Sequence, residues 1–265
     1  MTPTPLTPNK TMETVNTLKY AATALADLFM PRLCLGCGRP LGARERHLCI
    51  YCMADLPLTY NWMRTHNPMA DRFNERIQEG LEAGEYKVTE GMPKERYAFA
   101  AALFTYSSDS GFKEIPQALK YDGNIPAGRY FASLLGEKLS QSEHFLDVDL
   151  VIPVPLHPLR RFRRGYNQAE IIAREVSTRL GASESPSALK RIRYTKTQTK
   201  VLVQEKAGNV SGAFRAKPIA FQNKEHILIV DDVFTTGSTL YECYKAVREH
   251  FDGRISVATL AVVER

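Results

Sequence analysis

The sequence predicts an α/β protein, with a parallel sheet covered by helices, behind a small cysteine-rich module. Apolar runs without alternating polar residues are separated by segments of helical periodicity, which is typical of strands buried on both faces. Two Cys-x-x-Cys pairs lie near the N-terminus, and one apolar run passes directly into two aspartates and a hydroxyl-rich loop. We therefore expect an N-terminal helix and a four-cysteine module over 1–57, a connector over 58–95 and the α/β domain over 96–265.

Composition places the chain among ordinary soluble proteins. Its 265 residues are 44% hydrophobic and 24% charged, which suits one or two domains with a sizeable core. The formal net charge of +6 favours partners that carry phosphate, although proteins that never touch nucleic acid often have a similar excess. The start of the chain matches neither a signal peptide nor a membrane span, because Lys19 and Asp27 interrupt its apolar part. We expect a cytoplasmic protein with no membrane insertion and with reduced cysteines.

The first predicted element is an amphipathic helix over 15–29. Its apolar residues recur at helical spacing and would pack on the element that follows. They are Val15, Leu18, Ala22, Leu25 and Phe29.

Four cysteines predict a structural zinc site. Each Cys-x-x-Cys pair can direct two thiolates at one ion, and four thiolates complete a tetrahedral site with no position left for water. Metal binding would also supply the free energy that orders so short and polar a segment. Disulfides are the alternative, which a reducing compartment disfavours, and His47 lies between the pairs as a spare ligand. The four cysteines are Cys34, Cys37, Cys49 and Cys52.

The remaining predicted elements alternate between strands and helices. The polar connector should contain one helix, and its Trp62 either packs against the cysteine module or marks a contact surface. Strands are expected over 97–106, 149–155, 226–230 and 255–263, and helices over 112–120, 125–139, 168–180 and up to about 250. The fifth cysteine, Cys243, shares the apolar face of the last helix and is predicted to be a core residue.

The stretch after the third strand carries the main functional signal. Asp231 and Asp232 end an apolar run, at the edge of the sheet where open α/β proteins bind ligands. The next residues would turn into a helix and offer N–H groups and hydroxyls to a phosphate, and they are Thr235, Thr236, Gly237, Ser238 and Thr239. Two carboxylates would repel that phosphate, so we expect them to hold hydroxyls or a hydrated cation. Ribose 5-phosphate meets both requirements, and a simple helix cap is the alternative.

Residues 227–240 resemble the phosphoribosyl diphosphate (PRPP) signature of type I phosphoribosyltransferases. They contain an apolar strand, two acidic residues, then Val233 and Phe234, and a Thr-rich glycine loop. With IPVPLHPLRRFRRGYNQ at 152–168, QTKVLVQEKAGNVSGAF at 198–214 and the cysteine pairs, the chain is similar to the ComF family, which is associated in bacteria with competence and DNA uptake. The resemblance covers nearly all of residues 15–265 and implies a type I phosphoribosyltransferase-like sheet.

The resemblance also implies roles for individual residues. Asp231 and Asp232 would bind the ribose hydroxyls, and residues 233–239 would complete a site for PRPP with Mg²⁺. Pyrophosphate would lie on exposed N–H groups of a loop and on nearby cations, a set made of Pro153, Val154, Pro155, Leu156, Arg160, Arg164 and Lys120. Breaking the anomeric C–O bond needs charge stabilisation and no nucleophile. An (amido)phosphoribosyltransferase whose acceptor is unknown would fit this description.

A third set of residues would close over the ligand. Arg193, Lys196 and Gln198, with Thr197 and Thr199, match the mobile loop that covers PRPP and excludes water, and an exposed basic loop is the alternative. The family usually has arginine a few residues before the position of Asn209, where this chain has Lys206. A base-binding hood is expected within 97–125, where Lys120 either contacts pyrophosphate or is solvated.

Two functions remain open at this point. The chain could be a transferase that consumes PRPP in nucleobase salvage or related metabolism. It could instead keep the pocket as a sensor or scaffold and act in competence, with single-stranded DNA and proteins of the DNA-uptake machinery as partners. An arginine-rich run with interleaved aromatic rings favours the second, and its candidates are Arg161, Arg163, Phe162 and Tyr166. The directions of these arginines separate the two functions, with Arg164 expected nearer the pocket.

Overall fold

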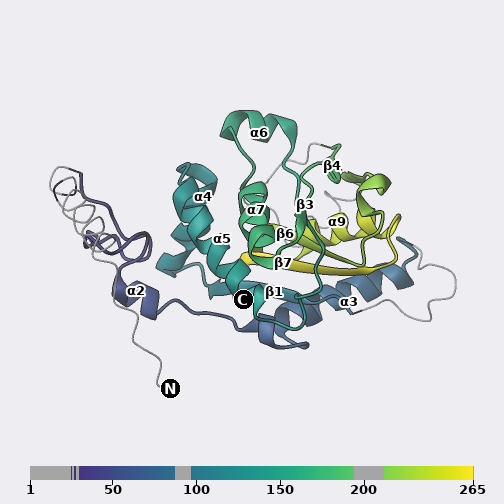
Figure 1. The fold of residues 1–265 in the computed structure, drawn as a ribbon, viewed down its shortest axis with the longest axis horizontal. Helices are drawn as coiled ribbons and strands as arrows, with labels where there is room; N and C mark the ends of the chain where they lie inside the picture. The colour runs from purple at the N-terminus through teal and green to yellow at the C-terminus, as the bar shows by residue number, and fades with distance from the viewer. Residues whose placement is uncertain (1–24, 26, 28–29, 87–96, 194–211, 265) are drawn as a thin grey trace, which may run out of the picture. The chain divides into compact units, whose positions relative to one another are not determined.

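The computed structural model describes residues 25, 27, 30–86, 97–193 and 212–264 (Figure 1). Most of the helix expected over 15–29 lies outside these residues, as do Lys196, Gln198, Lys206 and Asn209. The chain divides into two compact units, one of Met1–Leu56 with Ser110–Glu114 and one of Pro57–Asp109 with Ile115–Arg265. In the described part, no helix has both the length and the apolar character needed to cross a membrane.

The smaller unit is organised by backbone turns and one carboxylate. A bridge joins Leu33 to Pro40, and helix α2 (Ile50–Ala54) follows the second cysteine pair. The Glu45 carboxylate accepts the backbone N–H groups of Gly42 and Ile50, each at 2.7 Å, which fixes the connection between the cysteine pairs. The short helix η2 (Gly111–Lys113) belongs to the same unit.

The larger unit is built on a five-stranded parallel sheet. Its strand order is β1 (Ala100–Tyr106), β7 (Arg254–Val263), β6 (His226–Phe234), β2 (Leu150–Pro153) and β3 (Ser183–Glu184). Every neighbouring pair is parallel. Residues 57–59 pair antiparallel with β1 through Leu58 and Phe104. Strands β4 (Leu189–Arg191) and β5 (Phe214–Ala216) form a separate antiparallel pair.

Helices flank the sheet, which explains the uninterrupted apolar strands. Helices α5 (Ile125–Ser140) and α7 (Gln168–Leu180) pack on each other and on the sheet, and α4 (Glu114–Tyr121) precedes α5. Helices α3 (Pro68–Glu82) and α9 (Ser238–Arg248) contribute Phe73 and Tyr244 to a core with Ile227 and Ile229. Leu228, between those two isoleucines, is also fully buried, so both faces of β6 are covered.

The segment predicted as a connector contributes to the core of the larger unit. Four apolar side chains of α3 are buried there, although the segment is polar on average: Met69, Ala70, Phe73 and Ile77. Trp62, in helix η1 (Asn61–Met63), is also buried, and the Ser142 hydroxyl donates to its carbonyl oxygen. Trp62 is therefore a packed residue of the larger unit and not a contact surface, and its partner here is Ser142 of that unit.

Candidate functional site

A cavity of about 980 Å³ lies at the carboxyl ends of β1, β2 and β6. Basic side chains outnumber acidic ones in its lining, so the cavity suits an anionic ligand. The basic residues are Lys120, Arg160, Arg163, Arg164 and Arg191, and the acidic residues are Asp122, Asp231 and Asp232.

The two adjacent aspartates are held inside strand β6. Asp231 pairs in register with Thr259 of β7, and the Asp232 N–H donates to Asp231 Oδ1 at 2.9 Å. Burial and the neighbouring charge of Asp232 raise the pKa of Asp231 to about 7. Lys120 Nζ lies 3.1 Å from Asp232 Oδ2, so one carboxylate already faces a cation. The lysine is therefore neither solvated nor free for a phosphate in this state.

The hydroxyl-rich loop turns from β6 into α9. Thr235 and Thr239 line the cavity, and the Thr236 and Ser238 hydroxyls lie 2.9 Å apart beside it. Gly237 is the N-cap of α9 with φ of +74°, where a Cβ atom would lie 2.8 Å from the Phe234 ring. Glycine therefore permits the turn that brings the first N–H groups of α9 to the cavity end of the strand.

Phe234, from the predicted PRPP set, and Pro153, from the predicted pyrophosphate set, do not line the cavity. Phe234 is buried in the core against Phe73, with ring centroids 6.4 Å apart, while Val233 lines the cavity. Pro153 is buried at the end of β2. The alternation of side chains along a strand, which turns neighbours to opposite faces, accounts for the separation of Val233 from Phe234.

Three of the four residues in the loop after β2 do not offer the N–H group that the sequence analysis assigned to them. Pro153 and Pro155 have no N–H, and the Val154 N–H donates to the carbonyl oxygen of Val230 at 2.9 Å within the sheet. Val154, Pro155 and Leu156 do line the cavity. Of these four residues only Leu156 has an N–H group left to offer, so stabilisation of an anion here depends mainly on side-chain cations.

Helix α6 (Pro158–Arg164) carries most of those cations. Pro158 at its first position and Gly165 at its end, with φ of +81°, set its seven-residue length. The helix buries no residue, and Figure 1 shows it standing clear of the sheet. Its arginines therefore divide between the cavity and solvent.

The division differs in part from the expected one. Arg160, Arg163 and Arg164 line the cavity, so Arg163 does not belong with the outward group. Arg161 turns to Glu170 of α7 and makes two contacts, at 2.6 and 3.1 Å. Phe162 is 89% exposed.

Tyr166, a candidate for stacking on DNA bases, also lines the cavity. Its hydroxyl donates to the carbonyl oxygen of Leu119 in α4, which joins the end of α4 to the start of α7. Asn167, at the N-cap of α7, donates to the Val154 carbonyl at 3.0 Å. These bonds hold the walls of the cavity together.

Sequence reasoning missed Arg191 as a residue of this cavity. Arg191, at the end of β4, lies over the Phe214 ring, and burial together with the charge of Arg160 lowers its pKa. Tyr106 ends β1, and Tyr121 lies under the Arg164 guanidinium at 5.5 Å; both line the cavity and fall within the stretch 97–125 expected to form the hood. Arg193 is exposed and is absent from the described lining. The loop that the resemblance identifies begins at Arg193 and does not include Arg191, two residues earlier.

The four cysteines of the smaller unit form one cluster. Their Sγ atoms all lie within 4.8 Å of one another, and Cys37 and Cys49 are 3.8 Å apart. Four sulfurs held about 2.3 Å from one zinc ion in a tetrahedron would be about 3.8 Å apart, so the donor set fits zinc. The cysteines are free thiols here, and the cluster geometry fits a zinc ribbon.

The backbone around this cluster supports a thiolate at Cys34. Cys34 Sγ accepts the N–H groups of Gly36 and Cys49 at 3.4 and 3.3 Å. Burial acts to raise the pKa of the Cys34 thiol, but these N–H groups outweigh it and lower that pKa to about 7. Burial and neighbouring thiols raise the pKa of Cys52 above its usual range. At Gly36 a Cβ atom would lie 2.9 Å from Cys52 Sγ, so the turn leaves room only for glycine beside the sulfurs.

Cys243 lies apart from this cluster. It is fully buried in the core of the larger unit, where burial raises its thiol pKa well above the usual range. The structure confirms the prediction that it is a core residue.

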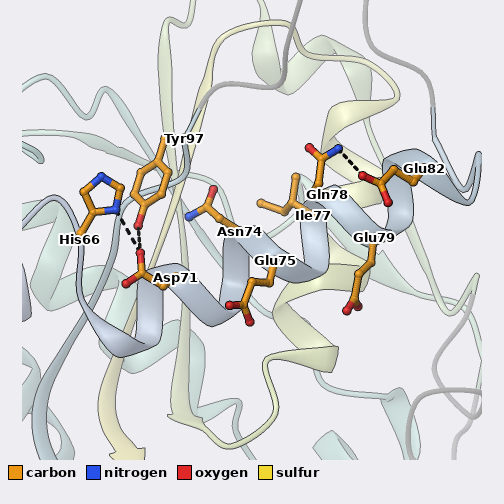
Figure 2. Close-up of a pocket in the computed structure, with 9 residues that line it drawn as sticks. All are labelled: His66, Asp71, Asn74, Glu75, Ile77, Gln78, Glu79, Glu82 and Tyr97. Carbon is orange, nitrogen blue, oxygen red and sulfur yellow. Dashed lines mark hydrogen bonds and ion pairs between the residues drawn. The ribbon is translucent and has the colours of Figure 1, made fainter.

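A second cavity, of about 660 Å³, lies along α3 (Figure 2). Asp71 Oδ1 accepts the Tyr97 hydroxyl at 2.7 Å and lies 3.1 Å from His66 Nδ1, while Glu75 and Glu79 turn away from that group. Carboxylates dominate this lining, so a phosphate ligand is disfavoured there.

A buried polar network lies at the amino end of β6, opposite to the first cavity. His226 Nδ1 is 2.7 Å from Asp147 Oδ1, and His226 Nε2 is 2.8 Å from Ser256 Oγ. Burial outweighs the attraction of Asp147 and lowers the pKa of His226. The network connects the turn before β2 to strands β6 and β7.

Comparisons with known proteins give several relatives, while no protein-family model matches the chain. Competence protein F of Haemophilus influenzae is 36% identical over 140 residues, which are 50% of this chain and 60% of that protein. DNA utilization protein YhgH of Escherichia coli K12 is 37% identical over 94 residues, 36% of this chain and 40% of that protein. Competence protein ComFC of Streptococcus pneumoniae is 27% identical over 162 residues, 61% and 66% of the two chains. The alignments thus span only part of the length of these relatives.

Proposed function

Because this chain belongs to the ComF family, as a homologue of competence protein F, ComFC and YhgH, we propose that it binds PRPP with Mg²⁺ and acts in natural competence by contacting single-stranded DNA. One observation carries the proposal: the first cavity places two adjacent aspartates, the start of α9 and several arginines around one space. PRPP combines hydroxyls with two anionic groups, so it needs all three features.

Each part of the cavity would bind one part of PRPP. The carboxyl oxygen atoms of Asp231 and Asp232 would accept hydrogen bonds from the ribose hydroxyls. The loop at 235–239 would hold the 5-phosphate at the positive end of α9. Arg160, Arg164 and their neighbours would hold pyrophosphate through charge-assisted hydrogen bonds. Mg²⁺, when bound with PRPP, would neutralise part of the pyrophosphate charge.

Calorimetric titration tests the PRPP assignment. Asp231→Asn with Asp232→Asn should lower PRPP affinity by about tenfold or more while inorganic phosphate binds at least as well as before, because two negative charges leave the cavity. A matched control is Glu75→Gln with Glu79→Gln, which removes two carboxylates from the second cavity. A double aspartate variant that binds PRPP like the parent would refute the assignment.

Single-stranded DNA binding is proposed for the outer face of α6. Phe162 is an exposed aromatic ring beside Arg161, and stacking with backbone contact is the usual basis of sequence-tolerant binding. To contact a DNA phosphate, Arg161 would have to give up its exposed ion pair with Glu170. Because an exposed ion pair is weak, this cost would reduce the contribution of Arg161 to DNA affinity without abolishing it. Both side chains lie outside the cavity lining, so DNA and PRPP can be tested separately.

Fluorescence anisotropy of a labelled oligonucleotide across a salt series tests this face. Phe162→Ala should lower affinity at every salt concentration, because stacking is worth about 1–3 kcal/mol per base. Arg161→Ala should lower the slope of log affinity against log salt by about 0.7, the contribution of one phosphate contact to a single strand. Leu159→Ala, also exposed on α6, is the control and should change neither quantity. If Phe162→Ala binds DNA like the parent, α6 is not the contact.

An active phosphoribosyltransferase is the second candidate function. The observation that favours it is the group of tyrosines around the cavity, Tyr106, Tyr121 and Tyr166, whose ring faces could accept a planar acceptor. Pyrophosphate release from PRPP, measured over a panel of nucleobases and amines with and without single-stranded DNA, tests this. Release that depends on an acceptor would establish transfer, and binding without release would favour a sensor or scaffold.

A further inference from the structure

Lys120 reaches the cavity from a backbone that is fixed on both sides. It lies in the last turn of α4, where the preceding Leu119 is fully buried and its carbonyl oxygen accepts the Tyr166 hydroxyl. The Asn124 N–H donates to the Ala118 carbonyl at 3.1 Å, and the Asn124 side chain caps α5. The turn after Lys120 is therefore closed, and the lysine chain has a defined origin in the cavity wall.

The ammonium lies where a cation bound to the aspartates would lie. Its nitrogen is 3.1 Å from Asp232 Oδ2, and the side chains of Lys120 and Asp232 are only 27% and 10% exposed. A contact this close and this shielded is stronger than a surface ion pair. The adjacent Asp231 belongs to the same group, because its own oxygen accepts the Asp232 N–H.

We propose that Lys120 is a built-in counter-cation of the aspartate pair, which keeps a divalent cation off Asp231 and Asp232 until a ligand enters. A divalent ion that approaches the empty cavity meets one carboxylate already paired with an ammonium. A ligand that carries phosphate groups offers the ammonium a second anion and offers the metal additional oxygen ligands. Metal binding at these aspartates is thereby coupled to ligand binding. This coupling rests on the proposed function, but the exclusion of the metal from the empty cavity does not.

Mn²⁺ is a suitable probe, because it prefers oxygen ligands and can be followed by its own paramagnetic signal as well as by calorimetry. The experiment uses the full chain supplied with zinc and free of PRPP. We expect Lys120→Met to bind Mn²⁺ about tenfold or more tightly than the parent, since a neighbouring positive charge has been removed. Adding Asp232→Asn to that variant should abolish the gain. Lys120→Arg keeps the charge and should resemble the parent, and Lys190→Met, an exposed lysine on β4, is the charge-matched control.

A second measurement applies if Lys120→Met fails to fold. In the Asp232→Asn variant Lys120 loses the carboxylate that favours its charged form, so more of it is the neutral amine that attacks an acylating reagent. Its acylation, followed by mass spectrometry, should therefore become several-fold faster than in the parent. The reactivity of Lys190 should stay unchanged. Equal Mn²⁺ affinity in Lys120→Met and the parent, or equal Lys120 reactivity with and without Asp232, would overturn the proposal.

The outcome is separable from that of the proposed function. A gain of Mn²⁺ affinity in Lys120→Met without any PRPP binding by the parent supports the counter-cation and contradicts the PRPP site. PRPP binding by the parent with no gain of Mn²⁺ affinity in Lys120→Met supports the PRPP site and contradicts the counter-cation.

Discussion

Replacing Gly237 by alanine tests whether the turn into α9 depends on glycine. The backbone there has φ of +74°, which costs an alanine about 1–2 kcal/mol. The added Cβ atom would also lie 2.8 and 2.9 Å from two ring carbons of Phe234, a buried side chain that cannot move freely. Overpacking of this kind costs about 1–3 kcal/mol, so the free energy of unfolding should fall by about 2–5 kcal/mol.

Urea denaturation of the parent and the variant measures this loss. Gly181→Ala is the matched control, because Gly181 ends α7 with φ of +69° and has no atom within 4 Å of a Cβ position. It should lose only the backbone part, about 1–2 kcal/mol. Affinity for PRPP should fall in Gly237→Ala alone, since its loop carries the proposed phosphate contacts. Equal destabilisation of the two variants would refute the clash with Phe234.

Two further predictions concern the cysteine cluster and the buried histidine. Protein purified without chelator should carry about one zinc ion per chain by metal analysis. The Cys49→Ser variant should lose the zinc ion and unfold in the smaller unit, while the melting temperature of the larger unit stays nearly unchanged. Disulfides between these cysteines, or metal-free protein, would contradict the prediction. Burial holds the pKa of His226 in the folded protein below its ordinary value of about 6.5, so the unfolded chain binds the proton more tightly. The free energy of unfolding should therefore be highest above pH 6.5 and should fall as the pH decreases from about 6.5 toward the lower folded-state pKa. Urea titrations between pH 7.5 and 5 should show this loss in the parent and a flatter profile in His226→Gln, and equal profiles would count against it.

Much of the larger unit could be predicted because its strands are buried on both faces. The helix expected over 168–180 is α7 (Gln168–Leu180), and the expected strand over 255–263 is β7 (Arg254–Val263) within one residue. The capping residues Asn167 and Gly181 mark the two ends of α7 in the sequence itself, so no distant contact is needed to locate this helix.

Elements that depend on distant partners were not predicted. Strands β3 and β4 have two and three residues, too few for any periodicity, and each exists only through its partner. Helix α3 is the helix expected within the connector, but its place in the core of the larger unit was not predicted, because its exposed face is strongly polar and its apolar stripe is narrow.

The candidate cavity could be predicted in part, since the resemblance also pointed to Lys120, Arg160 and Arg164, which line it. The aspartate pair and the glycine loop are contiguous in the chain, so their spacing is visible in the sequence. Arg191 and Tyr106 reach the cavity from strands far away in the chain, and the inward direction of Arg163 depends on the turn at Gly165. The hydrogen bond from the Val154 N–H to the Val230 carbonyl could likewise not be predicted, because it depends on which strand pairs with β2.

The buried network of Asp147, His226 and Ser256 bears on how function is inferred from side-chain geometry. Its hydrogen bonds follow the order of acid, imidazole and hydroxyl that hydrolases use to activate a serine. In a hydrolase the serine oxygen must meet a carbonyl carbon, and here Ser256 is 0% exposed and His226 is 1% exposed. A comparison of atomic positions alone would class this chain with the esterases, whereas the solvent exposure of the same atoms assigns the network to holding two strands and a turn together.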